Sequence, residues 1–204
     1  MNLGGDGERL RGWLPVPLTP EGVAQAHQAG KGLAGLHPAS FTASDLPRAQ
    51  QTARILEQYI GHQSTPHTGL RDWNTGALAG QKFTDIKDQL FHHIDNPDLA
   101  VHQGEPINHY LDRFLALVRP LVASPDLHIV VGHARGASIL QGIASKVGGK
   151  GQHVDPAFLK VRPEVKPGGI MVIDPDWNVT IHNLPAPSER SKARQGILDH
   201  MSKP

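Results

Sequence analysis

The sequence predicts an α/β domain built on a largely parallel β-sheet. Short apolar runs of strand length alternate with longer segments whose apolar residues recur at helical spacing, which is typical of such folds. A chain of 204 residues can form one domain with a sizeable core, whereas two compact domains would both be small. We therefore expect one domain over residues 1–184 and a polar C-terminal tail over residues 185–204.

The individual elements follow from local signals along the chain. Residues 1–17 are rich in glycine and proline and predict a loop, whereas Thr19 and Pro20 are a typical N-cap and first residue of a helix. Apolar periodicity predicts further helices over residues 47–60, 83–91, 105–122 and 136–147. Short apolar runs predict strands over residues 41–44, 127–131, 169–174 and 178–183. The last two strands are joined by a proline-containing turn and predict a hairpin.

Composition argues against several classes of function. The net charge of +1 is unlike that of a dedicated nucleic-acid-binding protein, which normally has a basic excess. No run of about eighteen apolar residues is present, so we expect no membrane span. No secretory leader is recognisable, and the absence of cysteine excludes disulfides, thiolate metal ligands and a cysteine nucleophile. These features fit a cytoplasmic protein with neither nucleic-acid nor membrane partners.

Three segments carry a polar side chain that packing alone does not require. Arg48 lies in the first turn of the helix expected over residues 47–60, where free N–H groups and a guanidinium together attract an anion. His133 directly follows the buried strand 127–131, at the strand end where open α/β sheets bind ligands. Asp72 lies in a loop and could act as a general acid if its surroundings raise its pKa. Taken singly, these residues are equally typical of a surface arginine, a buried structural histidine and a loop aspartate.

Taken together and in this order, these segments resemble the histidine phosphatase superfamily, the phosphoglycerate-mutase-like enzymes. The similar segments are residues 9–22, 44–53, 70–76, 104–113 and 132–133. The resemblance extends from residue 2 to about residue 184 and implies a three-layer α/β/α sandwich with a mostly parallel sheet. It also implies phosphoryl transfer through a phosphohistidine, a reaction that requires cationic donors around the phosphoryl group and an in-line nucleophile.

The resemblance assigns a role to each candidate residue. Arg48 and His133 would hold the phosphoryl oxygens, and the backbone N–H of Ala134 would be a further donor. Asp72 would protonate the leaving group, although glutamate is commoner at this position in the family. We therefore expect a phosphatase rather than a mutase.

Two more residues and the binding partners follow from the same resemblance. Asn2 would also contact the phosphoryl group, and Arg9 would face the remainder of the substrate. The expected partner is a small phosphorylated substrate, with no cofactor and no metal ion, and a homodimer is compatible with the sequence.

The segment that opens the family's domain is not recognisable in this chain. In the family, a hydrophobic strand runs into Arg-His-Gly, which supplies the nucleophilic histidine, and nothing in residues 1–12 resembles it. We therefore expect that the nucleophile is absent from this chain and that the sheet lacks its first central strand. Three hypotheses remain open: a phosphatase whose true chain extends upstream, a catalytically inactive phosphate-binding protein of the same fold, and a domain completed by a strand from another chain.

Other motifs in the sequence do not support a different function strongly. Residues 30–35 match a dinucleotide-binding fingerprint, but they lie at a helix end rather than between a strand and a helix. His92 and His93, like His62 and His67, lack the spacing of a metal site. No G-x-S-x-G motif is present, which disfavours a Ser-His-Asp hydrolase.

Overall fold

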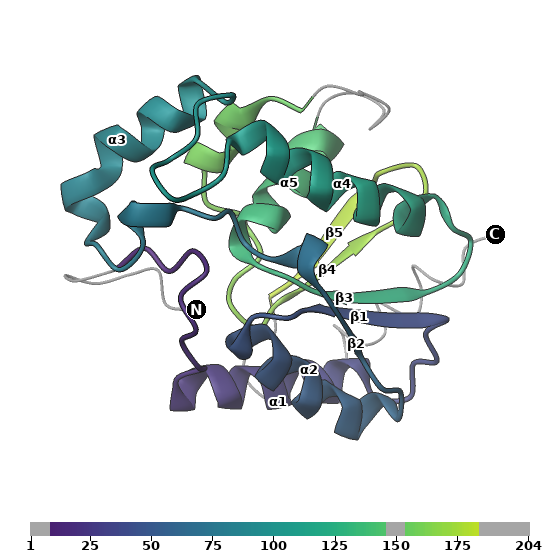
Figure 1. Ribbon diagram of the computed structural model, residues 1–204. Coiled ribbons are helices and arrows are strands. Elements are labelled where there is room, and N and C mark those ends of the chain that lie inside the picture. Colours follow the sequence, from purple (N-terminus) through teal and green to yellow (C-terminus); the bar gives the residue numbers. More distant parts are fainter. Residues whose placement is uncertain (1–8, 146–153, 184–204) are drawn as a thin grey trace.

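The computed structural model describes residues 9–145 and 154–183 (Figure 1). The helices are α1 (Pro20–Leu33), α2 (Pro47–Ile60), α3 (Phe83–Asp95), α4 (Ile107–Ala123) and α5 (Ala134–Ser145). The strands are β1 (Ser40–Ser44), β2 (Thr65–His67), β3 (His128–Val131), β4 (Ile170–Ile173) and β5 (Val179–His182). Helices α1 and α2 lie on one side of β1 and β3, and α4 and α5 lie on the other, which confirms the three-layer α/β/α arrangement.

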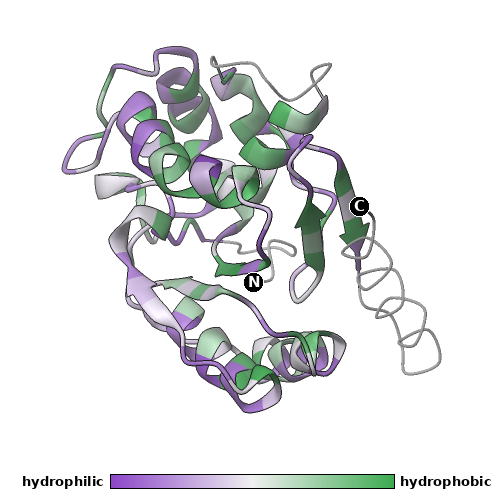
Figure 2. Cartoon of the chain, turned by 90° about the vertical axis from the view of Figure 1, so that its right-hand side faces the viewer, coloured by the Kyte–Doolittle hydropathy of each residue, from purple (hydrophilic) through white to green (hydrophobic). Residues whose placement is uncertain are grey.

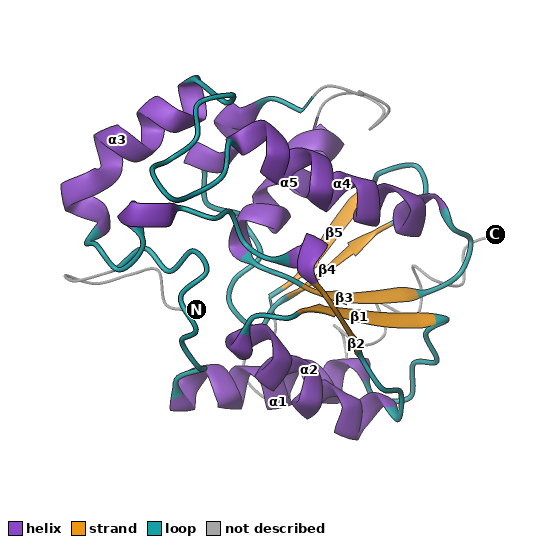
Figure 3. Cartoon of the chain, in the orientation of Figure 1, coloured by secondary structure: helices purple, strands orange, loops and turns teal. Residues whose placement is uncertain are grey.

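The main sheet is parallel and has the order β2-β1-β3 (Figure 3). Because its strands run in the same direction, their carboxyl ends meet at one edge, where Ser44 is in register with His67 and Ala43 with Val131. Strands β4 and β5 form the expected antiparallel hairpin. The sheet is therefore mostly parallel, as predicted.

In the described part of the chain, the hairpin is not hydrogen-bonded to the main sheet. Among the described residues, β3 pairs only with β1 and β4 pairs only with β5. Val131 of β3 and Ile170 and Val172 of β4 nevertheless pack against the same hydrophobic cluster, and Val130 of β3 is 38% exposed. Figure 2 shows that β4 is hydrophobic along its length. Two apolar strands with open edges thus border one core.

Some boundaries differ from the sequence-based expectation. Strand β2 was not predicted, because all three of its residues are exposed and its pairing with β1 alone makes it a strand. Helix α5 begins at Ala134, two residues earlier than expected, and α4 begins two residues later, at Ile107. The expected tail over residues 185–204 lies outside the described residues. No helix in the described part of the chain is both long and apolar enough to cross a bilayer.

Two loops, one after Asp72 and one before α4, are packed backbone to backbone. Gly76 has a φ of +44°, and a Cβ at this position would lie 2.1 Å from the carbonyl oxygen of His102. A Cβ on Gly104 would lie 2.5 Å from the carbonyl oxygen of Asn74. Because backbone atoms cannot swing aside as side chains do, both positions require glycine. This contact holds the loop after Asp72 against the start of α4.

Replacing Gly76 should therefore destabilise the protein more than replacing a glycine that has a positive φ but open space around its Cα. Gly61 provides the matched control, since its φ is +71° and a Cβ added to it would have no other atom within 4 Å. Gly61→Ala should cost about 1 kcal/mol in the free energy of unfolding, and Gly76→Ala should cost a further ~1–3 kcal/mol from the clash. Urea denaturation measures both values, and equal losses would contradict the packing described here.

Candidate functional site

Three of the expected site residues follow three neighbouring parallel strands. Arg48 lies in the first turn of α2, directly beyond β1, and His133 follows β3. Asp72 follows β2 and the short helix η1 (Thr68–Leu70). Because these strand ends share one edge of the sheet, the structure brings the three side chains together. Arg48 Nη2 lies 3.9 Å from Asp72 Oδ2, and both side chains are buried.

The guanidinium of Arg48 is held by the loop that precedes α1. Its Nη2 donates to the carbonyl oxygen of Gly12 at 2.9 Å, and its Nη1 donates to that of Leu14 at 3.3 Å. Its Nε is buried and has no hydrogen-bond partner among the described residues. Arg48 is thus fixed in orientation and still has a donor available.

His133 is buried and uncharged at neutral pH. Its Nε2 lies 2.9 Å from Oγ of Ser44, the last residue of β1. Burial lowers the pKa of the His133 imidazole to about 4, and the positive charges of Arg48 and Arg135 offset the opposing effect of Asp72. A neutral imidazole carries one N–H donor and one acceptor, so it can hold an anionic oxygen without adding a full charge.

The surroundings of Asp72 favour the ionised form of its carboxyl group. Its Oδ1 accepts a hydrogen bond from the backbone N–H of Trp73 at 3.0 Å, and its Oδ2 accepts one from Arg135 Nη1 at 3.0 Å. Burial alone would raise the pKa of the Asp72 carboxyl. The charges of Arg135 and Arg48, joined by that of His133 once the imidazole is protonated at low pH, outweigh that effect, so the pKa of Asp72 lies below its ordinary value. The raised pKa that a general acid needs is therefore not present while the carboxyl is paired with Arg135.

Arg113 on α4 fixes the loop that carries Asp72. Its Nε and Nη2 donate to the two carboxylate oxygens of Glu105 at 3.0 and 2.6 Å. Further N–H groups of the same guanidinium donate to three backbone carbonyls of the loop, those of Gly69, Arg71 and Asp72, at 2.9–3.1 Å. The position of the Asp72 carboxylate thus depends on a side chain from a different element.

The remaining expected site residues are placed differently. Ala134 is the first residue of α5, so its N–H has no acceptor within the helix and lies next to His133. Arg9 lies on the surface, where its Nη1 donates to the carbonyl oxygen of Gly80 at 2.7 Å, and the structure does not bring it into contact with the cluster around Asp72. Asn2 lies outside the described residues.

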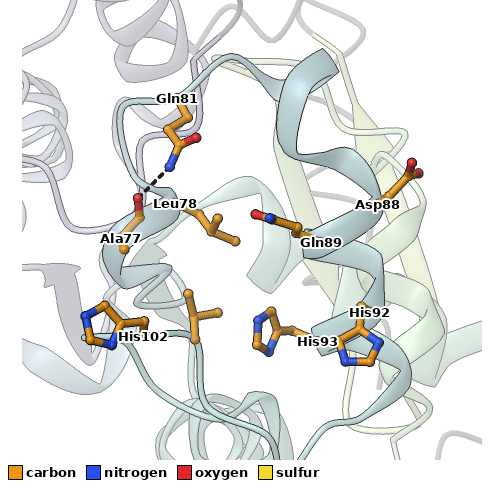
Figure 4. A pocket seen from close by; sticks show the side chains of 9 residues that line it. Ala77, Leu78, Gln81, Asp88, Gln89, His92, His93 and His102 are labelled. Carbon is orange, nitrogen blue, oxygen red and sulfur yellow. Dashed lines mark hydrogen bonds between the residues drawn. The ribbon is translucent and has the colours of Figure 1, made fainter.

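A separate pocket lies beside α3 (Figure 4). Its lining includes His92, His93 and His102. His93 Nδ1 is bonded to the carbonyl oxygen of Leu99 at 3.2 Å. Within the described residues, no three histidine, aspartate or glutamate side chains converge as metal ligands would.

The fold and the cluster agree with a comparison of the chain with known families. The sequence model of the histidine phosphatase superfamily (branch 1) matches residues 5–150. The chain belongs to this superfamily.

Two curated relatives have similar sequences. A probable phosphoglycerate mutase of Proteus mirabilis is 28% identical over 141 residues, which cover 67% of this chain and 63% of the relative. The chain thus matches less than two thirds of that protein's length. A 2,3-bisphosphoglycerate-dependent phosphoglycerate mutase of Maricaulis maris is 26% identical, with 81% of each chain covered.

Solved structures of the superfamily have the same fold. A mycobacterial glucosyl-3-phosphoglycerate phosphatase in complex with inorganic phosphate has a TM-score of 0.59 at 25% identity, covering 77% of this chain and 80% of that chain. Its complex with VO3 has a TM-score of 0.60 at 27% identity, covering 76% and 79%. A protein of Thermus thermophilus has a TM-score of 0.63 at 23% identity, covering 86% and 90%.

Sequence reasoning missed two residues of this superfamily member's cluster. Ser44 was noted only as the start of a motif, although it is fully buried and bonded to His133. Arg135 was given no role, because its ion pair with Asp72 depends on a contact between distant segments of the chain. The only available signal was the position of each residue at the carboxyl end of an expected strand.

The buried His133 predicts a specific pH dependence of stability. Its pKa falls from an ordinary 6.5 to about 4 on folding. The stabilisation that this group contributes to the free energy of unfolding is therefore complete above pH 6.5 and is lost as pH falls toward 4. Between pH 7 and pH 4, the wild type should lose about 3 kcal/mol more unfolding free energy than His133→Gln. Urea denaturation at both pH values tests this, and parallel losses in the two proteins would refute it.

Replacing the guanidinium of Arg113 should lower the stability of the whole fold. Lysine keeps the charge but cannot reach both Glu105 oxygens and three carbonyls, so Arg113→Lys should lower the free energy of unfolding by roughly 3 kcal/mol. Arg54→Lys is the matched control because Arg54 is an exposed arginine on α2. If both variants unfold at the same urea concentration, Arg113 does not have the role assigned to it.

Proposed function

We propose that this chain is the larger part of a phosphoric monoester hydrolase that works through a phosphohistidine, with the nucleophilic histidine supplied from outside these 204 residues. The observation that carries the proposal is the cluster at the carboxyl edge of the sheet. There, Arg48 and His133 lie near the buried carboxylate of Asp72, and the N–H of Ala134 directly follows His133 in the chain. The substrate would be a small phosphorylated molecule.

The chemistry of these groups suits a phosphoryl ester. Phosphoryl transfer spreads negative charge over the oxygens of the transferred group, so fixed cationic donors stabilise the transition state. Arg48 is the fixed cation, because backbone carbonyls orient its guanidinium. The N-terminus of α5 adds free N–H groups and the positive end of the helix dipole. Asp72 would protonate the leaving oxygen after gaining a proton itself.

The comparisons support an oxyanion ligand. Solved structures of the mycobacterial phosphatase contain inorganic phosphate in one case and VO3 in another. A phosphoryl group and these anions each carry several negatively charged oxygens on one central atom, and arginine and helix N-termini bind such oxygens. Hydrolysis rather than mutase chemistry is the activity that we favour, because Asp72 stands where glutamate is commoner in the family.

The nucleophile is the missing component of the site. His133 Nε2 is already bonded to Ser44 in the described residues, and the sequence has no Arg-His-Gly segment. Within the described part of the chain, the unpaired edges of β3 and β4 offer a place where a further strand could pair and carry such a segment. A set of phosphate-binding groups without a nucleophile also favours the alternative of a non-catalytic phosphate-binding protein.

The 204-residue chain should bind orthophosphate through Arg48. Replacing this arginine removes charge-assisted hydrogen bonds, so Arg48→Gln should weaken phosphate binding about ten- to a hundredfold in isothermal titration calorimetry. Arg54→Gln, an exposed change on the same helix, should leave the affinity unchanged. Equal phosphate affinity in Arg48→Gln and the wild type would exclude Arg48 as a phosphate ligand.

Turnover and intact mass separate the hydrolase from its alternatives. The chain as printed should hydrolyse p-nitrophenyl phosphate little or not at all, and brisk turnover would show that the nucleophile lies within it. The protein from its native source should be active and heavier than 22.1 kDa. A native mass equal to 22.1 kDa, with phosphate binding but no turnover, would support the non-catalytic protein. Co-purification of a short peptide would support completion by another chain.

A further inference from the structure

The cation closest to Asp72 is a residue to which neither the motifs nor the comparisons assign a role. Arg135 Nη1 lies 3.0 Å from Asp72 Oδ2, and the two side chains are 17% and 4% exposed. The Arg135 guanidinium also lies over the buried ring of Trp73, with 5.7 Å between its Cζ and the ring centroid. Arg135 is therefore part of the site's interior, although it belongs to the first turn of α5.

Arg135 is held far less firmly than the other two arginines near Asp72. Arg48 and Arg113 each donate to backbone carbonyls, which fix their orientation. Within the described residues, Arg135 donates a single hydrogen bond, and its acceptor is the Asp72 carboxylate itself. Its remaining N–H groups are unused there. Of the three cations, Arg135 is the one that can change partner without breaking backbone contacts.

A phosphoryl group would compete with Asp72 for this cation. Bound beside Arg48 and the N-terminus of α5, the dianion would lie close to the Asp72 carboxylate. Two like charges in a buried site cannot both persist, so one of them takes up a proton. Arg135 gains more from a phosphoryl oxygen than from a carboxylate that has become neutral.

We propose that Arg135 is a further phosphoryl-binding residue, one that pairs with Asp72 in the empty site and transfers its hydrogen bond to a phosphoryl oxygen when substrate binds. Asp72, released from the ion pair and next to a dianion, takes one proton from the solvent and becomes the proton donor for the leaving oxygen. The inference rests on the proposed phosphatase function and explains how a carboxylate that is ionised in the empty site becomes an acid only when substrate is present.

Other charged groups around Asp72 do not replace Arg135 in this role. The groups that face it come from α2, α4, the end of β3 and α5, and they are Arg48, Tyr110, Arg113, His133 and Arg135. Tyr110 is buried and its pKa is raised, so it stays neutral. His133 is neutral at pH 7, and Arg113 reaches only the backbone carbonyl of Asp72. Arg48 lies 3.9 Å away, which leaves Arg135 as the direct partner.

The test follows the Asp72 carboxyl by carbon NMR while orthophosphate is added, with Asp72→Asn used to assign its resonance. In the wild type, saturating phosphate should raise the pH midpoint of Asp72 by about one unit or more. In Arg135→Gln, the midpoint should already be raised without phosphate, and phosphate affinity should fall about tenfold. Arg135→Lys keeps the positive charge, so the pH midpoint of Asp72 and the phosphate affinity should both lie close to their wild-type values.

Several outcomes would overturn the inference. One is an Asp72 midpoint that is the same in Arg135→Gln and the wild type, and another is a wild-type midpoint that phosphate leaves unchanged although calorimetry shows binding. If the wild type binds no phosphate while Arg135→Gln still raises the midpoint, the proposed function fails, and the substrate-driven exchange fails with it. Thermal unfolding and circular dichroism of each variant show whether the fold is intact, and Arg135→Lys repeats the test if Arg135→Gln does not fold.

Discussion

The guanidinium of Arg113 is the interaction on which the geometry of the site depends. It joins α4 to the loop after β2. The guanidinium donates to both carboxylate oxygens of Glu105 and also to three backbone carbonyls of that loop. Glu105 also accepts a hydrogen bond from the backbone N–H of Asn74, so the same ion pair holds the loop on both sides of Asp72. Without Arg113 these loop carbonyls would be left to water. The geometry around Asp72 and the stability of the fold thus depend on one side chain.

The charge balance of the site follows from that placement. Asp72 is a single buried carboxylate beside Arg48 and Arg135, and His133 adds no charge at neutral pH. Burial lowers the pKa of Arg48, and the positive charges of Arg11 and Arg135 act in the same direction. A buried cluster with more cations than anions carries a desolvation cost that a bound anion relieves. The same imbalance therefore favours an anionic ligand, and under the proposed function Arg135 would change partner when that ligand binds.

The sequence predicted what local patterns determine and missed what depends on contacts between elements. The positions of Arg48 at a helix start and His133 at a strand end were visible in apolar periodicity, and their roles as phosphate ligands stay a prediction. Strand β2 was missed because its residues are exposed and only pairing with β1 defines it. The partner of Arg135 depends on side-chain direction across three elements, which no local pattern encodes. The expected role of Arg9 toward the substrate stays a prediction, and its hydrogen bond to the Gly80 carbonyl is a contact that no local pattern showed.

The missing pairing between β3 and β4 in the described part of the chain suggests where a strand that carries the nucleophile could lie. Among the described residues, β3 and β4 have open edges over one shared core, and Val130 of β3 remains 38% exposed. A strand that paired with both would satisfy their free N–H and C=O groups and cover this apolar surface. If it ran parallel to β3, its carboxyl end would reach the edge that carries Arg48 and His133. Under the proposed function, the segment that completes the sheet is therefore also the segment that delivers the nucleophile, and a strand that restored stability without restoring turnover would separate the two roles.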